Sequence, residues 1–238
     1  MTLWHAVGEN DEKMFQRIMD EAIIRPLDAG DIYRAMDCAA AKGYAIYLER
    51  LAPLATPTAH KNAFKSSAGH GNIQCLKVLQ TYISAEDDCW LRSFEECANN
   101  SLLVGALLCF PSNCDHVACL DLLAPYVSKD EANRVLAFMG GQCSVEILNV
   151  LLKYADPQYN NSRALQRAVK ENAQRNIDIL YPISDPVAAL KVMQEGVLPK
   201  CTVEDWMPLY ERIESERLKN ILGNEVKSSS AMARNYKI

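Results

Sequence analysis

The densest group of potential metal ligands in the sequence lies in one short segment, which contains Cys109, Cys114, His116 and Cys119. Three thiolates and one imidazole could complete a tetrahedral zinc shell. The spacing matches no paired Cys-x-x-Cys knuckle, and Cys119 falls on an apolar helix position where a free cysteine packs as a small hydrophobe. A zinc-binding protein or a cysteine-dependent enzyme built on these residues is therefore the alternative interpretation of the chain.

Cysteine and histidine also lie close together at His70 and Cys75, and at Cys114 and His116. A cysteine nucleophile needs a neighbouring base, a third group that orients the base, and an oxyanion site. The sequence indicates neither of the last two, and it contains no Gly-rich phosphate loop and no His-Glu-x-x-His motif. We expect that the chain is not an enzyme and that it needs no cofactor.

Composition narrows the class of protein further. The chain has 238 residues, of which 49% are hydrophobic and 23% charged, as in ordinary folded proteins. Its net charge of -5 argues against binding to nucleic acid or to an anionic membrane surface. The N-terminal segment lacks a secretory signal, and the nine cysteines are odd in number and irregularly spaced. We expect a cytoplasmic protein with free thiols; for a secreted effector, the cytoplasm would be that of a host.

A degenerate repeat is the main signal for the fold. Each copy begins with an apolar residue and a small-residue step, continues with a polar or glycine corner, and ends in Leu or Ile at helical spacing. The copies are Thr2–Met19, Arg34–Leu51, Asn62–Leu79, Arg134–Leu151 and Arg163–Leu180. This pattern predicts pairs of short helices that bury their apolar faces only by stacking on neighbouring pairs.

Glycine supports the corners of these pairs. Gly43 and Gly71 lie 28 residues apart, and each can adopt the left-handed backbone that a tight turn between two helices needs. The small pairs Ala39-Ala40 and Ser67-Ala68 allow the two helices to approach closely. We therefore predict an all-α fold, an α-solenoid of stacked helix-turn-helix repeats with C-terminal capping helices.

Two segments resemble the ankyrin repeat family. The run from Thr2 to Val7 is similar to the ankyrin T-P-L-H-x-A motif without its proline, and Gly71–Leu79 is similar to the ankyrin G-H-L-E-V-V-K-L-L run. The resemblance implies a repeat protein that binds another protein, often as an effector or inhibitor, and it implies a structural role for His5. The spacing of about 28 residues is shorter than the usual 33, so we expect short loops in place of β-turn fingers. A helical repeat of another family is the alternative.

The predicted domains follow from where the repeat weakens. Residues 1–184 form the ankyrin-like repeats, with an insert at about 101–114 that lengthens a first helix and then makes a loop. Residues 185–225 form a helical cap, in which Asp185 caps a helix that Gly196 ends. Residues 226–238 are polar and Ser-rich, and we expect a disordered tail.

The default binding surface of such a repeat protein is the concave side formed by its first helices and corners. Arg163, Arg167 and Lys170 share one helix face by their spacing and could meet an acidic partner. With the aromatic residues that carry interface energy best, the candidate contacts are Trp4, Tyr44, His70, Trp90, Phe110, Arg163, Arg167 and Lys170. We expect a monomer whose partner is another protein and neither nucleic acid nor membrane.

Overall fold

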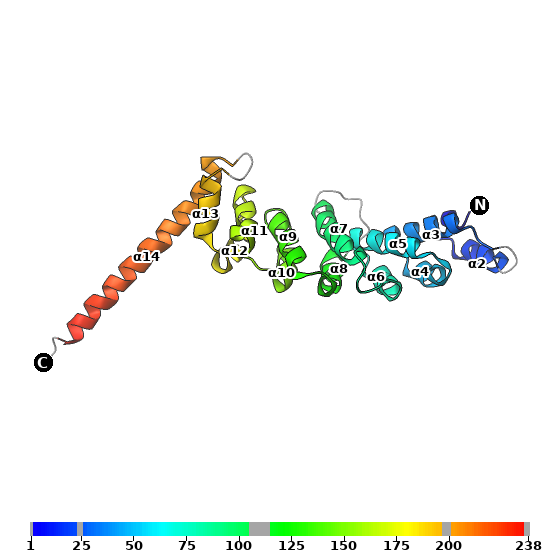
Figure 1. The fold of residues 1–238 in the computed structure, drawn as a ribbon, viewed down its shortest axis with the longest axis horizontal. Coiled ribbons are helices and arrows are strands. Elements are labelled where there is room, and N and C mark those ends of the chain that lie inside the picture. Colours follow the sequence, from blue (N-terminus) through cyan, green and yellow to red (C-terminus); the bar gives the residue numbers. More distant parts are fainter. Residues whose placement is uncertain (1, 23–25, 105–114, 197–200, 236–238) are drawn as a thin grey trace. The chain divides into compact units, whose positions relative to one another are not determined.

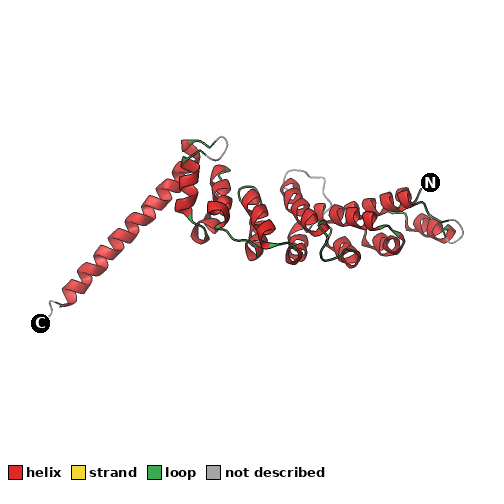
Figure 2. Cartoon of the chain, in the orientation of Figure 1, coloured by secondary structure: helices red, strands yellow, loops and turns green. Residues whose placement is uncertain are grey.

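The computed structural model describes residues 2–22, 26–104, 115–196 and 201–235, which form helices joined by turns (Figure 1, Figure 2). No strand occurs in these four ranges, so the prediction of an all-α fold is confirmed for them. Among the described residues, short turns join the two helices of a hairpin, and no β-turn finger occurs there. Within the same ranges, no helix combines the length and the apolar character needed to cross a bilayer.

The chain divides into two compact units: unit 1 is Met1–Met139 with Cys143–Asp156, and unit 2 is Gly140–Gln142 with Pro157–Ile238. The helices of unit 1 are α1 (Leu3–Gly8), α2 (Glu12–Glu21), α3 (Ala29–Lys42), α4 (Ala45–Leu51), α5 (Pro57–Gly69), α6 (Ile73–Leu79), α7 (Cys89–Val104), α8 (His116–Leu123), α9 (Lys129–Met139) and α10 (Val145–Tyr154). Those of unit 2 are α11 (Tyr159–Lys170), α12 (Gln174–Leu180), α13 (Pro186–Gln194) and α14 (Val203–Asn235). Single 3-10 turns follow four second helices, at Ala52–Leu54, Gln80–Tyr82, Ala124–Tyr126 and Tyr181–Ile183.

The boundary between the units falls near Asp156, inside the segment 1–184 that the sequence predicts as one repeat domain. The observed boundary differs from the predicted one because α11 packs against α13 and α14, which belong to the predicted cap. The last predicted repeat thus shares a core with the C-terminal helices.

In unit 1 each hairpin packs on the next one. The first helices contact one another in chain order from α1 to α9, and the second helices α4, α6, α8 and α10 do the same. The last turns of these second helices bury the leucines of the repeat pattern, Leu51, Leu79, Leu123 and Leu151. Each buried leucine contributes about 1.5–3 kcal/mol, and one hairpin alone would leave it exposed.

Four hairpin corners share one backbone geometry. The N–H group at the end of the corner donates to the carbonyl five residues earlier, at 2.8–2.9 Å, in Asp11, Tyr44, Asn72 and Ala173. The residue just before each donor has a positive φ, and these residues are Asn10, Gly43, Gly71 and Asn172. This is the Schellman arrangement that ends a helix. The glycine corners predicted from sequence are confirmed, and asparagine makes the same turn twice.

Polar side chains also connect successive hairpins. The Nδ2 atom of Asn72 donates to the carbonyls of Ala40 and Ala41, at 2.7 and 3.0 Å. The Nε2 atom of His116, at the equivalent repeat position, lies 3.2 Å from the carbonyl oxygen of Gly69. The last carbonyls of a helix have no partner within the helix itself. A side chain of the following hairpin supplies that partner in both places.

The irregular segments agree with the prediction only in part. Helix α7 runs to Val104, so the start of the predicted insert does lengthen a first helix, and residues 105–114 lie outside the described ranges. Helix α13 begins as expected, because the Asp185 carboxylate accepts from the N–H groups of Val187 and Ala188. Gly196 follows the helix with a φ of 70°.

Helix α14 corrects the predicted end of the chain. It continues past Gly223 to Asn235, through most of the segment 226–238 that the sequence predicts to be a disordered tail. One glycine inside a helix costs only about 1 kcal/mol, and no proline follows it to stop the helix. Residues 236–238 lie outside the described ranges.

Candidate binding surface

The predicted Cys/His cluster is only partly visible in the structure, because Cys109 and Cys114 lie outside the described residues. His116 and Cys119 both belong to α8 and are buried. Burial lowers the pKa of His116, so its ring stays neutral and its Nε2–H donates to the Gly69 carbonyl. The part of the chain that the structure describes contains no group of three or more potential ligands placed to hold a metal ion.

Three buried cysteines have pKa shifts that oppose the reactivity of a catalytic thiol. Desolvation raises the pKa of Cys75 and of Cys143 to about 12, and it raises the pKa of Cys97 well above its ordinary value. A nucleophilic cysteine needs the opposite shift, toward the thiolate. His70, the predicted neighbour of Cys75, places its Nδ1 atom 2.8 Å from the carbonyl oxygen of Ser66. Of the four cysteines that fall on core positions of the repeat, Cys75, Cys97 and Cys119 are fully buried and Cys38 is half-buried.

Two of the aromatic candidates lie near the N-terminus. Trp4 is half-buried and stacks on His5, with ring centroids 3.8 Å apart. The Nδ1 atom of His5 lies 2.6 Å from the Thr2 hydroxyl, which connects the two polar residues of the ankyrin-like motif. Tyr44 is half-buried and borders a hollow of about 420 Å³ that includes Ile46 and Tyr47. Phe110 lies outside the described residues.

Trp90 is a core residue and not a surface contact. Its side chain is only 2% exposed, and its Nε1–H donates to the Ser84 carbonyl at 2.8 Å. The ring stacks on Tyr126 at a centroid distance of 3.8 Å and meets Phe64 edge-on at 4.9 Å. Burial leaves Trp90 no surface for a partner, so we exclude it from the candidate contacts.

The predicted basic residues of α11 belong to unit 2 and are half-buried. The Nη1 atom of Arg163 donates to the buried Gln166 side chain at 3.1 Å. Desolvation, together with the neighbouring Arg167, lowers the pKa of Arg163. Lys170 borders a hollow of about 290 Å³ that also contains Glu204 and Asp205. Arg163 is thus engaged inside the unit, and Lys170 faces a mixed set of charges.

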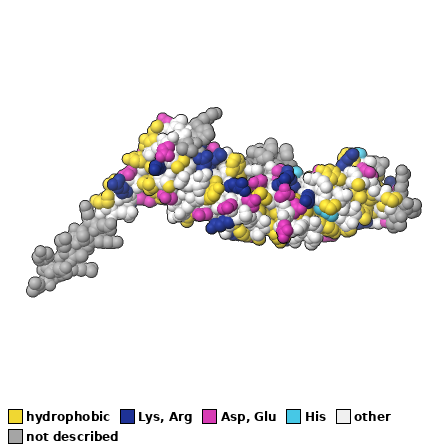
Figure 3. Space-filling view, viewed as in Figure 1, with side chains coloured by type: hydrophobic (Ala, Val, Ile, Leu, Met, Phe, Trp, Pro, Cys, Tyr) yellow, Lys and Arg dark blue, Asp and Glu magenta, His cyan; other side chains and the backbone are white. Residues whose placement is uncertain are grey.

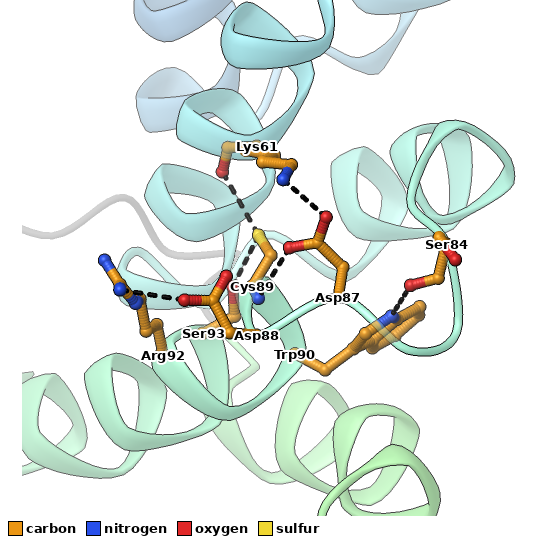
Figure 4. Close-up of polar contacts among 8 residues, drawn as sticks. All are labelled: Lys61, Ser84, Asp87, Asp88, Cys89, Trp90, Arg92 and Ser93. Atoms are coloured by element: carbon orange, nitrogen blue, oxygen red, sulfur yellow. Dashed lines mark hydrogen bonds and ion pairs between the residues drawn. The ribbon is translucent and has the colours of Figure 1, made fainter.

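A hollow of about 280 Å³ between α5 and α7 has three cationic side chains in its lining. Its lining consists of Pro57, Thr58, Lys61, Asn62, Lys65, Asp88, Cys89 and Arg92. Figure 4 shows that Arg92 and Trp90 extend to opposite sides of the start of α7, so the helix directs the arginine outward and the indole inward.

The ion pairs of this hollow differ in strength. Lys61 Nζ lies 2.5 Å from Asp87, whose other carboxylate oxygen accepts from the Cys89 N–H at 3.0 Å (Figure 4). The Lys61 hydrogen bond lowers the pKa of Asp87 and raises that of Lys61, so both stay charged. Arg92 pairs at 2.8 Å with Asp88 of the preceding turn, and both side chains are about two-thirds exposed.

A second hollow, of about 290 Å³, lies between α7 and α9 and is lined by Glu95, Asn99, Arg134, Val135 and Phe138. Phe138 is 49% exposed, which is unusual for a large aromatic side chain. We call the surface formed by these two hollows the first-helix face. In Figure 3, basic and acidic side chains lie close together over much of the visible surface, and no continuous basic area appears there.

Arg92, Arg134 and Phe138 were not among the residues singled out from the sequence. A partial signal for the arginines was present, because the repeat copies at Arg34, Arg134 and Arg163 begin with arginine. Arg92 lies two residues before Phe94, as Asn62 lies two residues before Phe64, so it occupies the equivalent position in α7. Arg34, Arg92 and Arg134 are exposed, so the repeat does not need them for packing.

The chain matches no protein-family model, no curated protein and no solved structure.

Proposed function

We propose that this chain is an ankyrin-like α-solenoid that binds another protein through the first-helix face of unit 1. The observation that carries the proposal is the pair of adjoining hollows on either side of α7, with Arg92 at one and Arg134 and Phe138 at the other. Arginine and aromatic residues that sit in pockets carry most of the energy of protein interfaces.

Three observations support the repeat assignment within this proposal. The hairpins of unit 1 pack in chain order, the Schellman corners recur, and the Thr2–His5 contact joins the polar residues of the ankyrin-like motif. Stacked repeats form extended surfaces from equivalent positions of successive units. An effector or inhibitor would use this face to cover a surface of its target.

The competing surface is the hollow around Tyr44 on the second-helix side. It is larger, at about 420 Å³, and Ile46 beside it is 66% exposed. It lacks a lysine or arginine in its lining, and Glu12 is its one charged residue among those described. We favour the first-helix face because it combines aromatic, cationic and polar groups, as protein interfaces do.

Site-specific photo-crosslinking tests the proposal. A photoreactive phenylalanine analogue is placed at Phe138 in one variant and at Ile46 in another, and each purified protein is irradiated in lysates. We expect a discrete protein adduct from position 138, which excess unlabelled chain competes away, and none from position 46. Adducts from position 46 alone, or no competable adduct from either position, would overturn the proposal.

A further inference from the structure

Helix α14 has two faces of different character. On one face Leu209 is buried, and Arg212 pairs with Asp178 of α12. On the same face Glu216 accepts a hydrogen bond from the Tyr181 hydroxyl at 3.0 Å. The period of about 3.6 residues places large apolar side chains on the opposite face, where they are 41–60% exposed. This exposed stripe consists of Val203, Tyr210, Leu218, Ile221 and Leu222.

The helix continues beyond the part that packs inside unit 2. Figure 1 shows that α14 extends well past its contact with α13, and residues 217–223 are all exposed. Most of the stability of a helix in a protein comes from the packing of its apolar face. A partner that covers the exposed stripe would therefore stabilise the segment after Glu216.

The charges of α14 are divided between its two halves. Residues 203–216 contain five acids and one base, a net charge of -4, and residues 217–235 contain four bases and one acid, a net charge of +3. Pairs formed within one half leave its net charge unchanged. The pair between Glu214 and Arg217 joins the halves and leaves excesses of -3 and +2. The acids of the first half are Glu204, Asp205, Glu211, Glu214 and Glu216, and the bases of the second half are Arg217, Lys219, Lys227 and Arg234.

The dipole of the helix accounts for only part of this division. Acids near the N-terminus and bases near the C-terminus stabilise a single helix, but the effect is confined to the first and last turns. Glu211, Glu214 and Lys219 lie well inside the helix. Their order along the chain favours a partner helix whose charges run in the opposite order.

We infer that α14 pairs with α14 of a second copy of this chain, in antiparallel orientation, through the exposed stripe. Antiparallel pairing places the acidic half of each helix along the basic half of the other, and the twofold symmetry of a dimer forms this contact twice. Parallel pairing would place like charges together, which opposes association. A dimer differs from the monomer expected from the sequence. It concerns unit 2 and does not rest on the function proposed for unit 1.

The length of α14 provides enough surface for such a dimer. A helix of 33 residues is about 50 Å long and about 10 Å wide, so contact along its length covers about 500 Å² on each copy. The two copies together bury about 1,000 Å², which lies at the lower limit for a specific interface. We therefore expect a reversible dimer with a dissociation constant in the micromolar range.

Sedimentation equilibrium of the full chain between about 1 and about 200 µM tests the inference. We expect the mass to rise from that of one chain toward that of two. The double variant Leu218→Gln/Ile221→Gln should raise the dissociation constant at least about tenfold, because it removes apolar side chains from both copies while glutamine remains a good helix former. Circular dichroism melts of the variants exclude a loss of fold.

Val187→Gln is the matched control for this variant, because Val187 is 63% exposed on α13 of the same unit. It should leave the dissociation constant unchanged. A chain that stays monomeric over the whole range, or an equal effect of the two variants, would overturn the inference.

Salt dependence tests the antiparallel orientation. Opposite charges that face each other attract less when salt screens them, so the dissociation constant should rise several-fold between about 50 and about 500 mM NaCl. Glu211→Lys should weaken the dimer, whereas Glu86→Lys, an exposed acid of unit 1, should not. A dimer that tightens with salt has like charges in contact and would refute the antiparallel pair.

Anionic vesicles distinguish a second copy from a lipid surface, which an amphipathic helix can also bind. We expect no cosedimentation of the chain with phosphatidylserine vesicles, because the acidic half of α14 is repelled by them. Vesicle binding that is lost in Leu218→Gln/Ile221→Gln would overturn the inference and assign the exposed stripe to a membrane.

Discussion

Arginines at equivalent repeat positions behave differently in the two units. In unit 1, Arg92 and Arg134 project from α7 and α9, and among the described residues each forms an ion pair only with an acid of the preceding turn. In unit 2, Arg163 is half-buried and bonded to the buried Gln166. Arg212 of α14 lies 2.8 Å from Asp178 of α12, and its guanidinium stands over the Tyr181 ring at 4.1 Å.

The difference shows how a repeat position acquires its role. The repeat fixes which face of a helix a residue occupies, but the neighbouring element decides whether its charge stays exposed or becomes part of the core. In unit 2, the Gln166 side chain bonds to Arg163, and Tyr181 and Asp178 contact Arg212, whereas Arg92 and Arg134 of unit 1 project into the hollows beside α7. We therefore expect larger losses of stability from substitutions in unit 2 than from the matched substitutions in unit 1.

The largest effect is expected from Gln166→Met. Gln166 is fully buried, donates to the Asn161 carbonyl at 2.7 Å and accepts from Arg163. Methionine keeps the shape and removes both bonds, leaving groups unsatisfied at a cost of about 1–3 kcal/mol. It also frees the turn at residues 160–162, whose positive φ values store strain. We expect about 2 kcal/mol lower unfolding free energy in denaturant titrations, with faster hydrogen exchange in unit 2.

Lys65→Met provides the control for this variant, because Lys65 occupies the equivalent repeat position in α5 and is exposed. It should change stability by less than about 0.5 kcal/mol. If Gln166→Met and Lys65→Met lose similar stability, the burial of residue 166 in unit 2 does not distinguish it from the exposed residue 65 in unit 1.

The next effect concerns Arg212→Ala. The change removes the contact with Asp178, the longer contact with Glu216 at 3.8 Å, and the cation–π contact with Tyr181. Exposed ion pairs and cation–π contacts together predict a loss of about 1–2 kcal/mol. Arg217→Ala on the same helix, whose partner Glu214 is 3.5 Å away, should lose less than about 0.5 kcal/mol. Thermal melts of the two variants that coincide would contradict this expectation.

The corners show what a sequence can reveal about this fold. The turns at Gly43 and Gly71 can be predicted from the sequence, because glycine alone adopts positive φ without strain. Asn10 and Asn172 make the same turn, but asparagine is common in loops and marks a corner only when a repeat alignment points to it. The buried leucines were also predictable from the repeat, since Leu51 and Leu79 are 28 residues apart, as are Leu123 and Leu151.

The binding surface was less predictable because it depends on contacts between distant segments. Trp90 looked like a surface anchor, but Phe64 and Tyr126 from two other elements bury it. The helical spacing predicted that Arg163 is available to a partner, but its guanidinium donates a hydrogen bond to the buried side chain of Gln166. No local pattern predicts the hollows beside α7, which form only when α5, α7 and α9 pack.

A smaller effect is expected from Arg163→Met. The variant loses the hydrogen bond to Gln166. It also removes a charge that is unfavourable where it lies, because desolvation and the nearby Arg167 lower the pKa of Arg163. The two terms oppose each other, so the net loss should be about 0.5–1 kcal/mol, below the roughly 1.5–3 kcal/mol typical of hydrogen bonds to charged groups. Arg134→Met at the equivalent position of unit 1 is the comparison, and chemical denaturation should show no loss there. Destabilisation of Arg134→Met to the same degree would place both arginines in structural roles.

The smallest expected effect is that of Arg92→Met on stability. Its pair with Asp88 is exposed at both ends and belongs to one helix, so its loss should change the unfolding free energy by less than about 0.5 kcal/mol. Methionine keeps the apolar stem, so packing against the start of α7 is preserved. A melting curve unchanged from the parent protein, together with unchanged hydrogen exchange in α5 and α7, would confirm that Arg92 is not needed for the fold. A loss above about 1 kcal/mol would instead show that Arg92, like Lys61, holds α7 in place. Arg92 would then have a structural role like that of Arg163, and the contrast between the arginines of the two units would not hold at the proposed interface.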